Sequence, residues 1–244
     1  DWFYEPMQDW LIDFTIEVGG QPYNPYDANV PFLLADQARK AGNPVPTAKD
    51  EVLEMFGYGG WRFDPEAAAT LLESNGFTKV NDKWMLPDGS PWKMHLIGNT
   101  NPAHPQFKWA FQFADQWRKF GIDVDLENTD EMNTLEAIGT YDVSTNWPLS
   151  APGGSPDIYP DLQRYHSRYA VPVDERNVSG HESRWSHPDL DAIIDEMEGL
   201  ASGDPRIVDL STEGLKVLVR EQPGISLGSY VSVLGWDEYY WTNY

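Results

Sequence analysis

The chain has 244 residues, of which 41% are hydrophobic and 14% aromatic, so it can build a packed core and is not a disordered chain. Its formal net charge of −22 disfavours nucleic acid and anionic membrane surfaces as partners, because both require a basic face. The sequence contains no cysteine, which excludes disulfides, zinc thiolates and thiol nucleophiles. No apolar run reaches the ~18 residues of a membrane-spanning helix.

The first part of the chain is aromatic and irregular, with breakers at Gly19-Gly20 and Asn24-Pro25. Two short helices are expected near residues 33–41 and 48–57. Residues 1–59 are therefore predicted to be a lead-in with short helices, and residues 60–244 an α/β lobe. The aromatic ends, DWFYEP and YYWTNY, lead us to expect a single domain excised from a longer chain. No signal peptide is recognisable at the start.

The stretch FDPEAAATLLESNGF predicts a helix over residues 64–75. Asp64 suits the N-cap, because its carboxylate can accept from the amides of the first turn, and Pro65 suits the first helical position. Alanines and leucines form an apolar face, and Gly76 occupies the position where a left-handed residue ends helices.

The middle of the chain alternates between strands and helices. A strand, a Pro87-Asp88-Gly89 turn and a second strand are predicted over residues 83–97. Further elements are a helix over 105–120 with apolar positions that include Phe111, a strand over 122–126, a helix over 130–138, a strand over 141–143 and a loop over 147–160.

Near the C-terminus, SHPD at residues 186–189 opens a helix with Ser186 as its cap, and Asp204-Pro205 opens another that ends before Pro223. A final strand is expected over 225–233. This alternation predicts an α/β layer fold.

The order of these motifs resembles the second lobe of family 5 extracellular solute-binding proteins, the receptors of bacterial ABC importers for peptides, nickel and oligosaccharides. The resemblance rests on FDPEAAATLLESNGF, the PDGSP turn, GIDVDLE, YDVSTNW, SRWSHPDLDAIIDEM and QPGISL, and it covers roughly residues 60–244.

The resemblance implies one lobe of a two-lobe, type II-like periplasmic binding protein with a central mixed sheet flanked by helices. It also implies a missing first lobe, an ABC permease as partner, and a periplasmic or membrane-tethered extracellular location. Both ends of the chain would lie near the hinge between the lobes.

Ligand sites in open α/β sheets gather at the carboxyl ends of strands. Two loops meet this condition, one with Asn99 and Asn101 and one with Asn146 and Trp147. The resemblance places both at the cleft. Asn residues after a strand are also ordinary turn residues, so both interpretations remain open. Trp147 could stack on a sugar ring or an apolar side chain, or pack against its own loop.

Three further residues are candidate ligand contacts. His104 ends the first loop and could touch ligand or simply start the next helix. Arg184 and Trp185 precede a helix at a position where the family carries a cleft-facing Arg or Tyr. Arg184 could equally pair with a surface acid.

One position departs from the family's peptide receptors, which often carry an Asp three residues after the loop Trp to bind the ligand's α-amino group. Ser150 stands there, and Asp157 further along the loop is the possible substitute. An ammonium buried without an anion is poorly compensated, so an oligosaccharide is favoured over a free-amine peptide. The segment GWDEYYWTNY also resembles the oligosaccharide-binding branch.

No catalytic or metal motif stands out. The five His show no HExxH spacing, no GxSxG or phosphate loop occurs, and no cofactor is expected. The prediction is a non-catalytic lobe that closes on an oligosaccharide or oligopeptide. The alternative is a carbohydrate-active enzyme or a lectin-like carbohydrate-binding module.

Overall fold

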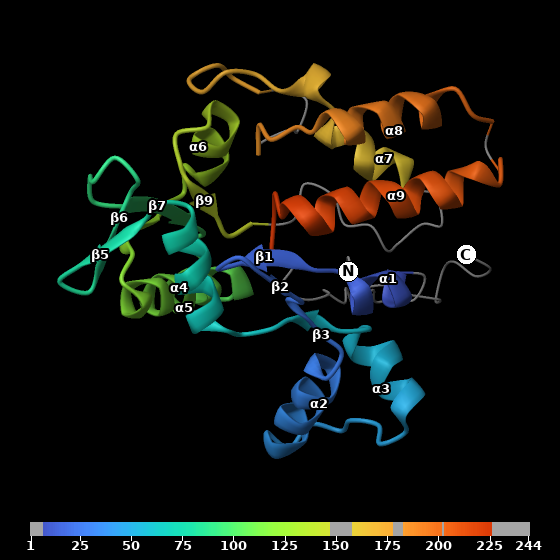
Figure 1. The fold of residues 1–244 in the computed structure, drawn as a ribbon, viewed down its shortest axis with the longest axis horizontal. Helices are drawn as coiled ribbons and strands as arrows, with labels where there is room; N and C mark the ends of the chain where they lie inside the picture. Colours follow the sequence, from blue (N-terminus) through green and yellow to red (C-terminus); the bar gives the residue numbers. More distant parts are fainter. Residues whose placement is uncertain (1–6, 147–157, 178–182, 202, 226–244) are drawn as a thin grey trace, which may run out of the picture.

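The computed structural model describes residues 7–146, 158–177, 183–201 and 203–225. Strands and helices alternate through the middle of the chain, and helices dominate its last third (Figure 1). The predicted α/β class is confirmed. The expected strand over 225–233 lies outside the described residues except for Ile225.

A three-stranded parallel sheet, in the order β8-β7-β9, is the centre of one part of the molecule, here called the α/β unit (residues 64–146). Helices connect its strands in the sequence β7-α5-β8-α6-β9. The bounds are β7 (Lys93–Gly98), α5 (Pro105–Phe120), β8 (Asp123–Asn128), α6 (Met132–Ile138) and β9 (Val143–Ser144).

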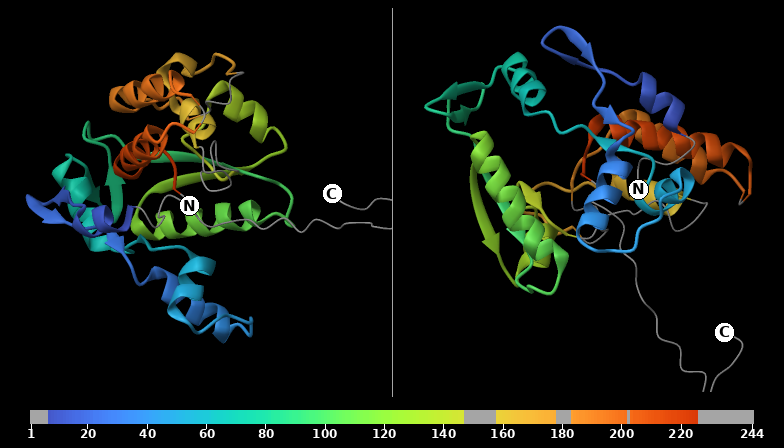
Figure 2. Two further views of the ribbon diagram at one scale, coloured as in Figure 1. Left: turned by 90° about the vertical axis from the view of Figure 1, so that its right-hand side faces the viewer. Right: turned by 90° about the horizontal axis from the view of Figure 1, so that it is seen from below.

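Helices α5 and α6 lie on opposite sides of this sheet (Figures 1 and 2). The strand order explains this arrangement. The connection from β7 to β8 and the return from β8 to β9 run in opposite directions, and same-handed crossovers then place their helices on opposite faces. All pairing within this described sheet is parallel, and the antiparallel pairs lie in separate two-stranded sheets.

The core of the α/β unit is built around Trp84, which is 1% exposed and donates its indole N–H to the Phe120 carbonyl at 3.0 Å. Its other buried members are Leu96, Ala114, Ile122 and Val124. Helix α5 ends at Gly121, whose φ of 110° only glycine adopts easily. Helix α5 therefore has the predicted bounds, but Phe111, expected on its apolar face, is 50% exposed.

Helix α4 (Pro65–Ser74) confirms the predicted capping, since the Asp64 carboxylate accepts from the Ala67 amide at 2.9 Å. The Tyr23 hydroxyl also donates to Asp64, at 2.9 Å, and so connects the N-terminal hairpin to the start of α4. The bonds from Ala67 and Tyr23 lower the pKa of Asp64.

The hairpin around residues 78–92 differs from the prediction. The two-stranded pairing joins β5 (Thr78–Val80) to β6 (Lys83–Met85), and Asn81 and Asp82 form its turn with φ of 49° and 61°. Both residue types tolerate the left-handed conformation that this turn requires. The predicted turn at residues 87–89 exists, but among the described residues the strand pairing across it consists of one isolated bridge, between Met85 and Pro91.

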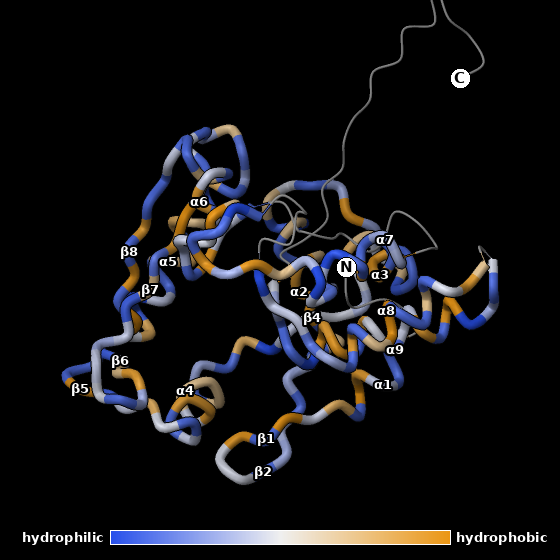
Figure 3. Tube along the Cα trace, turned by 90° about the horizontal axis from the view of Figure 1, so that it is seen from above, coloured by the Kyte–Doolittle hydropathy of each residue, from blue (hydrophilic) through white to orange (hydrophobic). Residues whose placement is uncertain are grey.

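The second part, here called the helical layer, packs helices from both ends of the chain against one another. Helices α8 and α9 lie against α7 and the short N-terminal helix α1 (Figure 1). The bounds are α1 (Gln8–Asp13), α7 (Tyr159–Leu162), η2 (Gln163–Tyr165), η3 (Ser167–Tyr169), α8 (Pro188–Glu198) and α9 (Arg206–Glu221). Apolar and polar residues alternate along α8 and α9 (Figure 3), as expected of helices with one buried face.

Helix α8 begins one residue later than predicted. His187, not Ser186, is its N-cap, and the Nδ1 atom of His187 accepts from the Asp189 amide at 3.2 Å.

The lead-in connects the two parts and contributes to the core of the helical layer through Met7, Leu11 and Tyr26. Gly19-Gly20 is the turn of its first hairpin, with positive φ at both residues. Its elements are β1 (Ile16–Val18), β2 (Gln21–Tyr23), β3 (Tyr26–Asp27), α2 (Val30–Lys40), α3 (Lys49–Phe56) and β4 (Gly60–Trp61). The two predicted short helices are thereby confirmed, while a boundary at residue 59 stays a prediction.

Candidate functional site

The carboxyl ends of β7, β8 and β9 lie along one edge of the parallel sheet, because the three strands run in the same direction. In the order β8-β7-β9, the direction in which strands are added reverses between β7 and β9, and open α/β sheets bind ligands at such a switch point. The two predicted loops leave the sheet at these strands, one after β7 with Asn99 and one after β9 with Asn146. The structure thus brings their starting points together.

The loop after β7 is built from consecutive side-chain turns. Asn99 accepts from the Asn101 amide at 2.6 Å, and Asn101 accepts from the Ala103 amide at 3.0 Å. His104 then occupies the N-cap of α5 without a side-chain cap bond and is exposed. The local turn interpretation of these residues is therefore confirmed. Each Asn uses its side-chain oxygen in the turn, and its side-chain NH2 group carries two further hydrogen-bond donors.

The loop after β8 is joined to the loop after β7. Thr129 donates its amide to the Gly98 carbonyl at 3.0 Å, and the Thr100 hydroxyl donates to Asp130. Gly98 is required here for packing, since a Cβ atom on it would lie 2.7 Å from Asn128 Oδ1 and 2.8 Å from Ala110 Cβ.

The end of β9 is fixed from both faces of the sheet. Asn146 donates its side-chain amide to Glu136 Oε2 at 2.7 Å, and Ser144 donates its hydroxyl to Glu136 Oε1. Thr145 points to the other face and lies within hydrogen-bond distance of the Gln106 carbonyl, at 3.3 Å. Burial raises the pKa of Glu136, and the bonds from Ser144 and Asn146 oppose that rise.

Two neutral side chains, Gln106 and Asn128, lie buried beside this edge. Gln106 is 3% exposed, and its Oε1 has no hydrogen-bond partner among the described residues; the same holds for both side-chain atoms of Asn128. Buried amides of this kind normally bond to protein, ligand or water. Amide side chains therefore form part of the structure beneath this edge.

Arg184 lies behind α6 and closes the C-terminal end of that helix. Its guanidinium donates to the backbone carbonyls of Glu136 at 3.2 Å, Ala137 at 2.8 Å and Glu175 at 3.2 Å. A cation at a helix C-terminus is favourable, because the last carbonyls lack partners within the helix. The side chain also packs on Gly139, where a Cβ atom would lie 2.5 Å from the guanidinium carbon.

Trp185 packs against the core of the helical layer, edge to face with Tyr165 at 5.9 Å and stacked with His187 at 6.2 Å. The contacts of Arg184 and Trp185 are thus those of packing and capping residues. The remaining predicted residues, Trp147, Ser150 and Asp157, lie outside the described residues.

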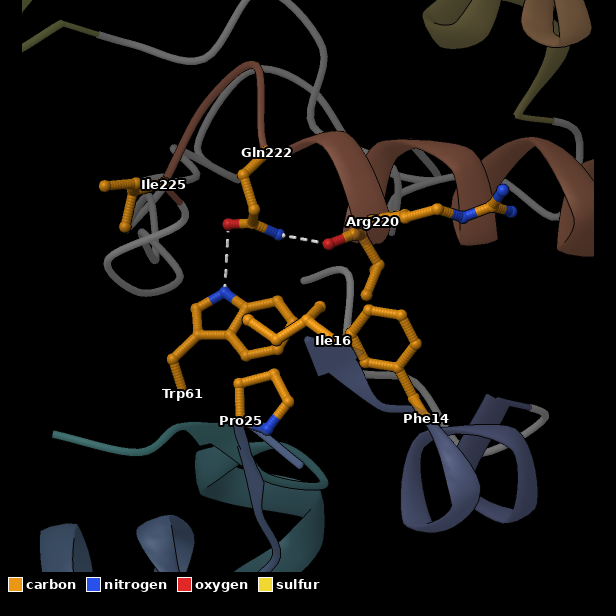
Figure 4. Close-up of a pocket in the computed structure, with 8 residues that line it drawn as sticks. Phe14, Ile16, Pro25, Trp61, Arg220, Gln222 and Ile225 are labelled. Atoms are coloured by element: carbon orange, nitrogen blue, oxygen red, sulfur yellow. Dashed lines mark hydrogen bonds between the residues drawn. The ribbon is translucent and has the colours of Figure 1, made fainter. Parts of the chain in front are cut away.

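A pocket of about 380 Å³ lies elsewhere, between the lead-in and the end of α9 (Figure 4). Phe14, Ile16 and Pro25 give it apolar walls, and Trp61 donates its indole N–H to Gln222 Oε1 at 3.0 Å. None of the described candidate residues lines it. Its walls suit an apolar group, whereas the polar groups that could orient a ligand gather at the sheet edge.

Sequence reasoning missed Glu136, Thr145, Gln106 and Asn128. Asn128 ends β8, two residues after its last apolar residue Leu126, and this position near a strand end could have been recognised as that of Asn99 was. Glu136 could not, because one acidic residue among 39 carries no local mark of burial.

Comparison with solved structures identifies proteins with this fold. The oligopeptide-binding protein of Thermotoga maritima, whose structure is described as mannohexaose-bound, superposes with a TM-score of 0.54 at 20% identity. That match covers 72% of this chain and 32% of the other. The oligopeptide-binding protein AppA of Bacillus subtilis, in complex with a nonapeptide, gives 0.52 at 15% identity and covers 66% and 31%.

The chain thus spans about a third of the length of these solved structures. No curated protein sequence matches it. None of the described helices is long and apolar enough to cross a membrane. The sequence profile of the bacterial extracellular solute-binding proteins, family 5 (middle part), matches residues 25–170, which is more than half of the chain, and the chain therefore belongs to this family.

Proposed function

We propose that this chain forms a ligand-binding lobe of the solute-binding component of an ABC importer. In this function the protein binds a solute outside the cytoplasmic membrane, in the periplasm or tethered to the membrane surface, and delivers it to the permease without chemical change. Hinge closure of two lobes on the solute would be driven by contacts that each lobe makes with it.

One observation carries the proposal: the polar edge at the carboxyl ends of β7 and β9 lies where open parallel sheets bind ligands. Asn99, Asn101 and His104 on one side and Asn146 on the other are the proposed contacts among the described residues. Trp147, Ser150 and Asp157 follow directly in the β9 loop and are proposed with them. Arg184 and Trp185 would contribute indirectly, Arg184 by capping α6 and Trp185 by packing against the helical layer.

We propose an oligosaccharide as the solute in preference to a free-amine oligopeptide. Amide and hydroxyl groups suit sugar hydroxyls, which both donate and accept. Two carboxylates beside the edge already accept bonds from the protein, Asp130 from Thr100 and Glu136 from Ser144 and Asn146. Ser150 in place of an acid removes the usual partner of a ligand ammonium.

The test is a binding screen on the complete gene product by thermal shift and calorimetry. The probes are mannohexaose, a nonapeptide and a nickel–histidine complex, chosen because solved proteins of this fold class bind such ligands. A probe at a hundred times its Kd should stabilise the protein by about 2.7 kcal/mol. A shift with mannohexaose alone is the expected result, and a shift with the peptide alone would overturn the choice of solute.

Replacing Trp147 by Ala should weaken binding of the active probe about tenfold, as expected for the loss of an aromatic platform. Phe63→Ala is the matched control, because Phe63 is 84% exposed and lies outside the edge. Release of shorter sugars from mannohexaose by the purified protein would instead support a carbohydrate-active enzyme.

A further inference from the structure

The side chains of residues 144–146 all make hydrogen bonds, in addition to the backbone pairing of the two-residue strand β9. Successive side chains of a strand point to opposite faces, and all three are bonded here. Ser144 and Asn146 bond to Glu136 on the α6 side, and Thr145 reaches the Gln106 carbonyl on the α5 side. The Thr145 amide also donates to the Ile97 carbonyl at 3.1 Å. The chain is thus fixed up to Asn146, the candidate ligand contact at the carboxyl end of β9.

Glu136 is an unexpected residue for its position. It lies within α6 and is only 4% exposed, where an ionised carboxylate loses much of its hydration. An apolar side chain of similar size would fill the space without that cost, so packing alone does not explain a glutamate. Both carboxylate oxygens are instead used to accept bonds from the two ends of the 144–146 segment.

The charged neighbour placed against this turn of α6 is Arg184, which bonds the backbone oxygen of Glu136. The same guanidinium bonds the next carbonyl and that of Glu175, so it anchors the end of α6 to the chain before α8. The end of α6 is therefore a fixed support, and Glu136 extends from that support to the end of β9.

We propose that Glu136 is a positioning residue of the ligand site, whose carboxylate holds Ser144 and Asn146 and thereby fixes the side chain of Asn146 at the carboxyl end of β9. This inference rests on the proposed function and adds a specific residue to it. A site whose polar groups are held in place before the ligand arrives loses less conformational entropy on binding. Glu136 itself need not touch the ligand.

The test compares Glu136→Leu with Glu136→Gln. Gln can accept from Asn146 through its amide oxygen and donate to the Ser144 hydroxyl through its amide nitrogen, so it keeps both bonds. Leu fills a similar volume and makes neither. Hydrogen exchange, read by mass spectrometry on the peptide that covers residues 141–146, should speed up about tenfold in Glu136→Leu and stay within about twofold of wild type in Glu136→Gln.

Peptides from α8 and α9 serve as the internal control and should exchange at the wild-type rate in both variants. Equal exchange of residues 141–146 in all three proteins would overturn the proposal. If Glu136→Leu loses protection throughout, Ser144→Ala provides the second variant, since it removes one of the two bonds. It should speed exchange of the same peptide about threefold, and a wild-type rate would overturn the proposal.

Binding of mannohexaose separates this inference from the proposed function. Glu136→Leu should weaken binding about tenfold, and Glu136→Gln should restore it to within about twofold of wild type. If wild type binds none of the probes, that result counts against the proposed function, and the exchange experiment still decides the role of Glu136.

Discussion

The α/β unit and the helical layer are built on different principles. The buried residues of the core cluster around Trp84 in the α/β unit come from one stretch of the chain between Trp84 and Val124. The core of the helical layer joins Met7 and Leu11, from the start of the chain, to Leu218 and Val219 more than two hundred residues later. Contacts at long sequence separation close large loops, whereas the α/β unit closes small ones.

This difference shows which part of the molecule positions the polar side chains of the candidate site. Its polar edge belongs to the locally built unit, where a βαβαβ sequence places three strand ends together without help from distant segments. The chain before α8 connects the two parts, because Arg184 caps α6 while Trp185 packs against the core of the helical layer. Substitutions in the two cores should therefore disturb different parts of the molecule.

The largest effect is expected from Trp84→Ala, which removes the biggest fully buried side chain of the α/β unit and its bond to Phe120. Loss of unfolding free energy should be about 3–5 kcal/mol, as for other buried aromatic truncations. Urea unfolding measures this loss, and hydrogen exchange should show it first in β7 and β8. Phe63→Ala, at an 84% exposed position, should change stability by less than about 0.5 kcal/mol. Similar losses in both variants would contradict the assignment of the core.

Leu11→Ala tests the core of the helical layer in the same way. Leu11 is fully buried in the helical layer, and its truncation should cost about 2–4 kcal/mol. The expected signature is faster exchange in α1 and at the facing surface of α9, with the β7–β8 pairing protected as in wild type. Its neighbour Ile12 is 59% exposed, so Ile12→Ala is the matched control with little expected change. Loosening of β7 by Leu11→Ala would show that the two parts unfold as one unit.

The smallest expected effect is a change of the unfolding free energy with pH that is caused by Glu136 in the α/β unit. Burial raises the pKa of Glu136 above its ordinary value of 4.5, so the folded state holds the proton more tightly than the unfolded chain. This contribution to stability is fully present below the ordinary pKa and is lost as the pH rises through the raised folded pKa. The unfolding free energy of wild type minus that of Glu136→Gln should therefore fall over this range and then level off.

Urea unfolding of the two proteins in parallel, from about pH 4 to about pH 8, measures this difference, in which the titration of all other groups largely cancels. A difference that rises with pH would mean that the bonds from Ser144 and Asn146 outweigh the effect of burial.

Local chemistry determined much of what the sequence alone could establish. Asp64, Pro65 and Gly76 defined α4, and Pro105 and Gly121 defined the bounds of α5, because capping and termination depend only on residues within a turn of each other. The alternation of strands and helices determined the α/β class, and the asparagines after β7 and β9 marked the sheet edge. These local features are the same in the folded protein, because among the described residues no tertiary contact replaces the local hydrogen bonds on which they depend.

Tertiary structure alone decided the partners of side chains that look alike in the sequence. Arg184 reads as a loop cation, and only the approach of the chain before α8 to the end of α6 makes it a helix cap. Phe111 has the same helical spacing as the residues that α5 buries, yet the sheet leaves it half exposed. Glu136 became a buried acceptor for Ser144 of β9 and for Asn146 just after it, because burial and pairing depend on which segments meet in space. No single stretch of sequence carries that information.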